Sequence, residues 1–194
     1  MDMNFKSSLM RPLAVGVVAA LMAFGTSAQA ADLWNVNADD STIAFTGKQL
    51  GADFNGAFES FNATIAFSPD DLAASSVEVL IDIASVNTQN GDRDSQIVSA
   101  DWFNAGEWPT AKFATKSFSE VAPGSYQAVA DLTIRDVTKE VTLPFDLVIN
   151  GNEAEAKGSV TIKRTDFGVG QGQWADVSQV GDDVTINITI KASK

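Results

Sequence analysis

Carboxylates are the groups of this chain that could carry out acid–base chemistry, because the sequence has no histidine and no cysteine. The absence of both residue types excludes thiol nucleophiles, histidine-based triads and metal sites built from imidazole or thiolate. Two carboxylates could still hydrolyse a glycosidic bond, and the candidates for such a pair are Asp94, Asp101, Glu107 and Asp166. Since acidic residues are frequent along the whole chain, we attribute this set to chance and predict no catalytic residues and no enzyme activity.

Arg93 and Asp94 are adjacent within a long segment, residues 85–113, that interrupts the strand pattern of the chain. The planar guanidinium of Arg93 could hold the anionic or carbonyl head group of a ligand through several hydrogen bonds at once. The pair could instead fasten the segment to neighbouring strand ends, and Arg164 could pair with Asp94 or Asp101. We favour the structural interpretation.

Two further motifs resemble ligand sites but lack the context that such sites need. The glycine-rich run 168–172 could bind a phosphate only if a helix followed it, and here the chain leads into a strand instead. Asp92, Asp94 and Asp101 miss the regular spacing of a calcium-binding loop. We therefore predict no metal ion and no cofactor, only a bound ligand.

The elements that position these residues are β-strands, because apolar and polar residues alternate with a period of two along most of the chain after residue 33. Long, sequential, one-sided strands are typical of an antiparallel sheet. About eight strands of roughly ten residues favour an all-β fold, an eight-stranded antiparallel lipocalin-like barrel. A two-sheet sandwich is the alternative. Residues 88–104 are expected to form a short helical crossover at one end of the strands.

Small residues on the inward faces of the predicted strands indicate an empty interior. A filled barrel would carry leucine or isoleucine at five positions that are small here: Ala128, Ala130, Ala154, Ala156 and Gly158. An eight-stranded barrel can be filled by its own side chains or can hold one ligand, and these small residues favour an apolar cavity. The alternative is that Trp102, Phe103 or Trp174 fills the space from outside the strands.

Residues 1–30 have the three parts of a secretory signal peptide. Lys6 and Arg11 supply a positive start, residues 12–25 form an apolar run too short to span a bilayer, and residues 28–30 match a small-residue cleavage site. We therefore expect a mature domain of residues 31–194 that is exported to the periplasm without stable membrane insertion.

The chain is acidic, with 25 Asp and Glu against 13 Lys and Arg. Loss of residues 1–30, which contain Lys6, Arg11 and Asp2, would leave 24 acidic and 11 basic residues and a net charge of −13. Such a surface repels phosphate backbones and anionic lipid headgroups, so we expect no nucleic-acid partner. With no cysteine for disulfides, stability must come from the core.

The order and spacing of several short motifs resemble the YceI-like family of exported, lipocalin-like, polyisoprenoid-binding proteins. The resemblance covers essentially the whole mature chain. The motifs that carry it are Gly56-Ala57-Phe58, Phe61, residues 83–88, Arg93-Asp94, residues 99–104, Trp108-Pro109, Phe113, and residues 132–139, 164–168 and 180–184. Family members often have histidine at the position of Gln96 and near Lys48-Gln49, so the resemblance does not specify the head group of a ligand.

The resemblance implies a barrel around a long apolar tunnel that holds an extended amphiphile, such as a polyisoprenoid, a ubiquinone-like molecule or a fatty-acid derivative. The predicted function is a periplasmic lipid-binding protein for transport, storage or stress response. The residues expected to line the tunnel and its mouth are Phe45, Phe58, Phe61, Ile81, Ile83, Arg93, Ile97, Trp102, Phe103, Phe113, Ala128, Ala130, Leu132, Ala156, Phe167 and Trp174.

The sequence leaves two features of this function undecided, and it also allows two alternative functions. A membrane-protein acceptor of the lipid and a homodimer are both compatible with the interpretation. The first alternative is a protein-interaction or stress scaffold that binds no lipid. The second, less favoured, is a carboxylate-dependent hydrolase.

Overall fold

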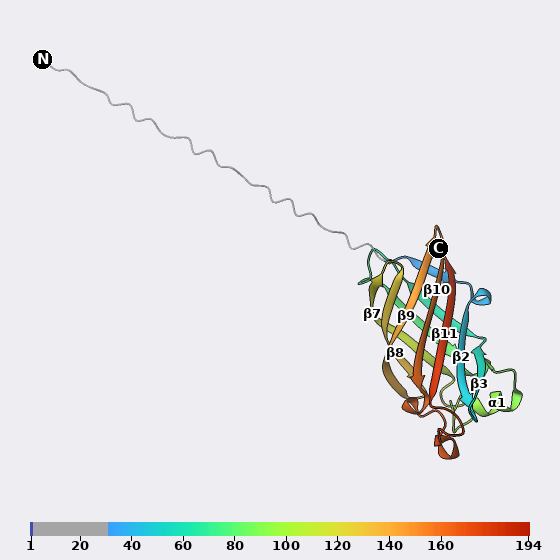
Figure 1. The fold of residues 1–194 in the computed structure, drawn as a ribbon. Coiled ribbons are helices and arrows are strands. Elements are labelled where there is room, and N and C mark those ends of the chain that lie inside the picture. Colours follow the sequence, from blue (N-terminus) through green and yellow to red (C-terminus); the bar gives the residue numbers. More distant parts are fainter. Residues whose placement is uncertain (2–30) are drawn as a thin grey trace.

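The computed structural model describes residue 1 and residues 31–194, and within them eight antiparallel strand positions form a barrel (Figure 1). Five positions are continuous strands: β7 (Thr110–Ala122), β8 (Ser125–Ile134), β9 (Val137–Asn150), β10 (Glu153–Lys163) and β11 (Asp183–Ser193). Each of the other three holds two shorter strands in line: β1 (Leu33–Val36) with β2 (Thr42–Gln49), β4 (Phe61–Ala66) with β3 (Ala52–Phe58), and β5 (Ser76–Asp82) with β6 (Val86–Asn87).

The barrel closes between the first and the last strand of the chain. β11 pairs with β10 on one side and with both β1 and β2 on the other, placing Val36 opposite Ala192 and Ile43 opposite Ile188. β1 pairs in turn with β4, and antiparallel pairing continues around the ring from β4 to β10. The predicted eight-stranded lipocalin-like barrel is therefore confirmed, and the two-sheet sandwich is wrong.

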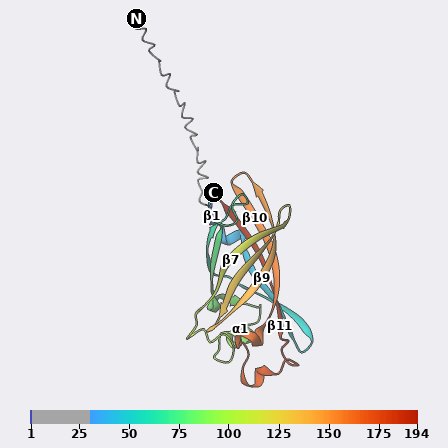
Figure 2. The ribbon, with the colours of Figure 1, turned by 90° about the vertical axis from the view of Figure 1, so that its left-hand side faces the viewer.

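The two ends of the barrel carry different connections (Figure 2). One end, which we call the helix end, has the β2–β3 turn, the crossover from β6 to β7 with helix α1 (Gly91–Ile97), the β8–β9 turn, and residues 164–182 between β10 and β11. The other, which we call the aromatic end, has the β4–β5 connection and the β7–β8 and β9–β10 turns. The helical crossover predicted near residues 88–104 is confirmed by α1.

Helix α1 is held at its start by side chains that bind backbone groups. Asn90 is the N-cap and accepts a hydrogen bond from the backbone N–H of Arg93 (3.0 Å), which satisfies an amide that the helix leaves free. Asp94 accepts hydrogen bonds from the backbone N–H and the hydroxyl of Thr88, at 2.8 and 2.6 Å. Together with the burial of Ile97, these contacts fix the crossover against the end of β6.

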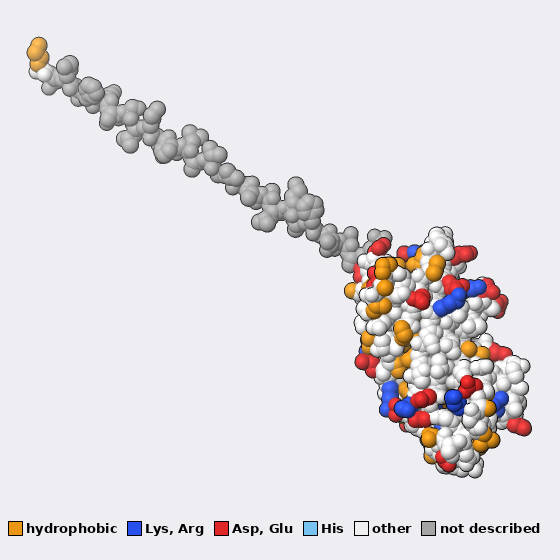
Figure 3. Space-filling view, in the orientation of Figure 1, with side chains coloured by type: hydrophobic (Ala, Val, Ile, Leu, Met, Phe, Trp, Pro, Cys, Tyr) orange, Lys and Arg blue, Asp and Glu red, His pale blue; other side chains and the backbone are white. Residues whose placement is uncertain are grey.

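The outer face of the barrel is polar and carries both signs of charge. From Val141 to the end of β9, half-buried and exposed residues alternate, as the two-residue period of a strand requires. Lys116 of β7 forms ion pairs with Asp131 (2.7 Å) and Glu140 (3.2 Å) on the next two strands. Acidic and basic side chains are interspersed over the face seen in Figure 3. The half-buried residues of this alternation in β9 are apolar and face inward.

Aromatic rings pack together inside the aromatic end. Phe67 lies edge-on to Phe118 and Tyr126, with centroid distances of 5.2 and 5.6 Å, and Tyr126 stacks on Phe145 at 5.5 Å. The indole N–H of Trp34 donates to the carbonyl oxygen of Phe67 (2.9 Å). Aromatic pairs in these geometries add to the free energy of burial. The rings therefore close this end of the barrel.

The predicted signal peptide, residues 1–30, lies outside the described residues apart from Met1. Among the residues that the structure describes, no helix has the length and apolar character needed to cross a bilayer.

Candidate binding cavity

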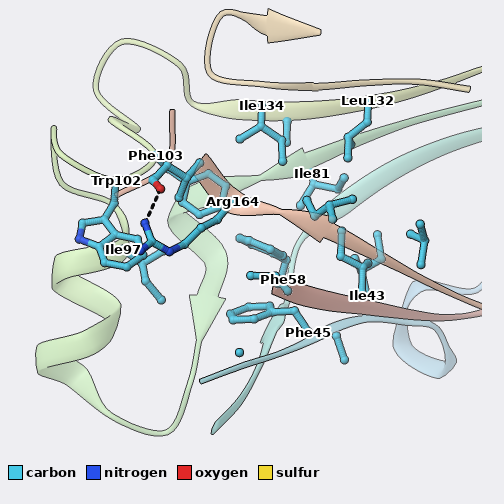
Figure 4. Close-up of a pocket in the computed structure, with 18 of the residues that line it drawn as sticks. Ile43, Phe45, Phe58, Ile81, Ile97, Trp102, Phe103, Leu132, Ile134 and Arg164 are labelled. Atoms are coloured by element: carbon cyan, nitrogen blue, oxygen red, sulfur yellow. Dashed lines mark hydrogen bonds between the residues drawn. The ribbon is translucent and has the colours of Figure 1, made fainter. Parts of the chain in front are cut away.

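A cavity of about 530 Å³ lies inside the barrel, toward the helix end. This volume falls within the range of typical small-molecule sites, about 300–1,000 Å³. Inward-facing residues from every part of the ring line it, and most of them are aliphatic or aromatic. Figure 4 draws 18 of these lining residues and labels ten of them, with Ile43, Ile81, Leu132 and Ile134 along the walls.

The walls on β9, β10 and β11 are incompletely covered by protein. Val141, Leu143, Val160, Ile162 and Ile186 all line the cavity and are half-buried, although they point into the barrel. Close-packed interiors leave few voids larger than a water molecule, so such residues would be fully buried in a filled barrel. Their accessible surface faces the cavity, and the interior therefore has room for an apolar ligand.

Polar side chains gather only at the helix end of the cavity. They come from the end of β2, from α1 and its N-cap, and from the connection after β10: Lys48, Gln49, Asn90, Asp92, Arg93, Gln96 and Arg164. Within this polar rim, Arg93 donates from Nε to the hydroxyl of Thr88 (2.9 Å) and from Nη1 to the side chain of Gln49 (3.1 Å). Its guanidinium also lies over the ring of Phe54, 4.3 Å from the centroid. Arg93 thus ties α1 to the β2–β3 hairpin while facing the cavity.

Arg164 is buried at the same end, with 3% of its surface exposed, and it lines the cavity. All five of its N–H groups donate to backbone carbonyl oxygens at 2.7–3.3 Å. The acceptors belong to Val169, Gly170, Trp174, Val180 and Gly181. Burial lowers the pKa of Arg164, partly offset by Asp182. Since its donors are all used, Arg164 holds the connection between β10 and β11 together and has none left for a ligand.

Gly170 makes this arrangement of Arg164 sterically allowed. Its φ is +84°, a conformation that other residues rarely adopt. A Cβ at this position would also lie 2.0 Å from Nη1 of Arg164. A larger residue would therefore displace the guanidinium from its carbonyl partners.

Trp102 and Trp174 lie side by side next to Arg164, with ring centroids 5.7 Å apart (Figure 4 draws Trp102 beside Arg164). The guanidinium carbon of Arg164 is 5.4 Å from the centroid of the Trp102 ring. Trp102 is buried, and its Nε1 has no hydrogen-bond partner, the one such buried side-chain atom among the described residues. Both rings line the cavity, so they narrow its helix end without filling the barrel.

A second, smaller cavity of about 110 Å³ lies toward the aromatic end. It is bounded by the aromatic rings of that end and by small residues of β8 and β10, namely Ala128, Ala154 and Ala156. Some of the small inward-facing residues therefore border empty space, and others are covered by aromatic rings. The two cavities share six lining residues and therefore adjoin.

A YceI-like domain profile matches residues 34–192, which is most of the chain. The chain belongs to the YceI-like family. It is 33% identical over 162 residues to a UPF0312 protein of Yersinia enterocolitica, covering 78% of this chain and 83% of the relative. It is 29% identical over 160 residues to a UPF0312 protein of Vibrio vulnificus, with coverage of 78% and 85%.

Solved structures share the barrel of this YceI-like protein. BcnA of Burkholderia cenocepacia superposes with a TM-score of 0.79 at 31% identity, covering 82% of this chain and all of that one. A polyisoprenoid binding domain from Saccharophagus degradans, implicated in plant cell wall breakdown, gives a TM-score of 0.67 over 84% of this chain and 99% of its own. The second match is 12% identical and supports the fold alone.

The structure brings most of the predicted ligand-binding residues of this YceI-like barrel to the two cavities. Those that line the larger cavity are Phe45, Phe58, Ile81, Arg93, Ile97, Trp102, Phe103, Phe113, Leu132 and Trp174. Ala128 and Ala156 line the smaller one, together with Phe113. Their alternation along strands, or their place in the crossover, was the signal that identified them.

Four predicted residues line neither cavity. Ile83 and Phe167 are almost fully buried in short 3₁₀ helices, Ile83–Ser85 and Arg164–Phe167, that pack beneath the barrel at the helix end. Ala130 is completely buried, with no exposed surface. Phe61 is half-buried against the same hydrophobic core as Ile83. These four side chains are therefore part of the packed structure and not of the cavity lining.

The predicted pairing of Arg164 with Asp94 or Asp101 is not formed. Arg164 binds carbonyl oxygens instead, and Asp94 accepts its hydrogen bonds from Thr88. The other carboxylates considered for catalysis are exposed: Asp101, Glu107 and Asp166. None of the four lines the larger cavity. Within the described residues there is also no group of three or more acidic side chains that could hold a metal ion.

Two functional features escaped the sequence interpretation. Arg135 in the β8–β9 turn donates to the carbonyl oxygens of Ala100, Trp102 and Gly168, joining the crossover to the β10–β11 connection. Arg135 lies in a tight turn with a φ of +57°, and no feature of the sequence indicated this role. The other is the way the polar rim is assembled, because the sequence did not show that Lys48 and Gln49 lie beside Gln96 and Arg93 at one end of the cavity.

Proposed function

We propose that this protein binds one long-chain amphiphile, such as a polyisoprenoid, a quinone with an isoprenoid tail or a fatty-acid derivative, inside the barrel. The observation that carries the proposal is the large apolar cavity whose polar side chains are confined to one end. Membership of the YceI-like family supports a binding barrel, and the Saccharophagus degradans domain that shares this fold is a polyisoprenoid binding domain. The proposed role is binding rather than catalysis, since none of the carboxylates considered for a catalytic pair lines the larger cavity.

The ligand enters tail first, with its head group at the polar rim. Burying a five-carbon isoprene unit contributes roughly 3–4 kcal/mol of gross transfer free energy, and long ligands retain nearer about 0.3 kcal/mol per heavy atom after the costs of binding. An exposed ion pair at the rim contributes about 0–1 kcal/mol. Tail length therefore sets affinity, and Arg93 sets selectivity among head groups, because it is half-buried and faces the cavity.

The cellular role that fits this ligand is transport or storage of lipid in the periplasm, or a stress response. The signal peptide expected in residues 1–30 supports periplasmic location. A membrane-protein acceptor that takes over the lipid would complete a transport role. A homodimer is compatible with this role but not required by it, since one chain contains the whole cavity.

The experiment that tests the proposal is organic extraction of the protein purified from cells, followed by mass spectrometry of the extract. We expect one species with a long apolar tail at about one molecule per chain. Recovery of empty protein that also fails to take up lipids when they are added would contradict the proposal. So would a bound molecule that is small and fully polar.

A matched pair of variants shows whether the lipid is inside the barrel. Val160→Phe on β10 places a ring into the larger cavity, whereas Ser159→Phe places the same ring on the exposed face of the same strand. We expect Val160→Phe to lose most lipid and Ser159→Phe to retain it, with both variants folded by circular dichroism. Equal lipid content in the two variants would contradict an internal site.

A further inference from the structure

The smaller cavity continues the larger one toward the aromatic end. The residues that line both belong to five strands and form the partition between them: Ile65, Val77, Phe113, Leu143, Ile188 and Ile190. All six have apolar side chains. The partition therefore presents apolar side chains to both cavities, across which a flexible chain in the larger cavity could reach the smaller one.

The smaller cavity has no polar group left to offer a ligand. Two of its lining side chains carry polar atoms, Trp34 and Thr115. The Trp34 indole N–H donates to the carbonyl oxygen of Phe67, and the Thr115 hydroxyl is bonded to the backbone of Val77 at 2.8 and 3.3 Å. A buried polar group without a partner is costly, so this space accepts hydrocarbon and rejects a hydroxyl or a carboxylate.

The aromatic end also forms a wall beyond the smaller cavity. Phe67, Phe118 and Phe145 line it and contact one another, with centroid distances of 5.2–6.3 Å. Close-packed rings yield little to an incoming group, because extra atoms in a packed core force side chains from their preferred rotamers. A tail that reaches these rings cannot extend further along the barrel.

From these three observations we infer that the smaller cavity is a terminal subsite, which receives the last hydrocarbon unit of the tail and sets the tail length that binds best. The inference rests on the proposed function, because it needs a tail in the larger cavity. Tails too short to pass the partition leave the subsite empty. Tails too long to fit before the aromatic wall leave part of their apolar surface in water.

The test is a series of isoprenoid amphiphiles with one head group and increasing numbers of units, with affinities measured by competition against a fluorescent lipid. We expect affinity to rise with each unit and then to level off or fall. Ala156→Leu fills the subsite from β10 and should weaken the affinity for the best-binding tail about tenfold. This is the loss expected when the five carbon atoms of one isoprene unit no longer bind. Shorter tails should bind as before. Lys157→Leu, at the exposed neighbouring position, is the control.

Two further arms keep the inference open to refutation if Ala156→Leu folds poorly. Phe118→Leu enlarges the subsite and should move the best tail to a greater length. A tail of the best length with a terminal hydroxyl should bind the original protein at least about tenfold more weakly. Unchanged length preference in both variants, or tolerance of the terminal hydroxyl, would overturn the terminal subsite alone. Failure of every tail to bind the original protein would overturn the proposed function and this inference with it.

Discussion

The two ends of the barrel are closed by different physical means. At the aromatic end, Phe67, Phe118, Tyr126 and Phe145 pack into the space between the strands. At the helix end, long connections cross the opening, and arginine side chains bind their backbone carbonyls, as Arg164 does five times. The first end depends on apolar burial and the second on hydrogen bonds.

The difference follows from how each end satisfies its backbone. At the aromatic end, the two-residue turns β7–β8 and β9–β10 leave few free carbonyl groups, so rings can pack against these strands directly. Residues 164–182 form no continuous ladder with a neighbour, and their buried carbonyl oxygens need other donors. A hydrogen-bonded closure leaves polar groups beside the mouth, whereas a ring-packed closure leaves none. The barrel thereby acquires one end suited to a head group and one suited to hydrocarbon.

The largest expected effect on stability comes from the aromatic end. Phe67→Ala removes a buried ring that contacts three others, and such truncations cost about 3–5 kcal/mol of unfolding free energy. Urea denaturation should show this loss as a lower midpoint with one cooperative transition. A loss below about 1 kcal/mol would mean that the rings are not the main closure of this end.

A smaller and more local effect is expected from Arg164→Met, which retains much of the apolar stem but removes five hydrogen bonds. We expect a loss of about 2–4 kcal/mol, because the carbonyl groups it leaves are partly able to bind water. Hydrogen exchange should rise most in residues 164–182. Arg135→Met, which removes fewer bonds from a less buried side chain, is the control and should cost less. Faster exchange spread evenly over all strands would contradict the proposed division between the ends.

The smallest effect concerns pH and again belongs to the helix end. Burial alone would raise the pKa of Asp182, but hydrogen bonds from the hydroxyl and N–H of Thr165 and the charge of Lys163 lower it on balance below the usual 3.8. The ionised form is thus favoured by folding, so its stabilisation is present above pH 3.8 and lost as the pH falls through the folded value. When the protein is titrated with acid, NMR should show that residues 164–182 lose their structure at a higher pH than the aromatic end. In the Asp182→Asn variant, the two regions should no longer differ in the pH at which they lose their structure. An acid response equal to that of the original protein would contradict this role of Asp182.

The sequence predicts the parts of this molecule that have a period and fails where there is none. Alternation in β8 to β11 identified the barrel and the inward faces, because one side of each strand must be apolar. It could not separate Ala130 on β8, which is covered completely, from Ala156 on β10, which lines the smaller cavity, because both occupy inward positions of the same two-residue alternation. The sequence also could not predict the hydrogen-bond partners of Arg164. Every residue has a backbone carbonyl group, and only the path of the connection brings these particular ones together.

The most direct test of a vacant interior that takes up a lipid tail is an NMR titration of methyl-labelled protein with a long isoprenoid amphiphile. Ile43, Ile186 and Ile188 line the larger cavity, whereas Val121 and Val148 are 58% and 57% exposed on the outside. We predict that the three isoleucine methyl signals shift together and saturate at one ligand per chain, while the two valines stay unchanged. Shifts confined to the exposed valines, or no shift at any ratio, would contradict the account.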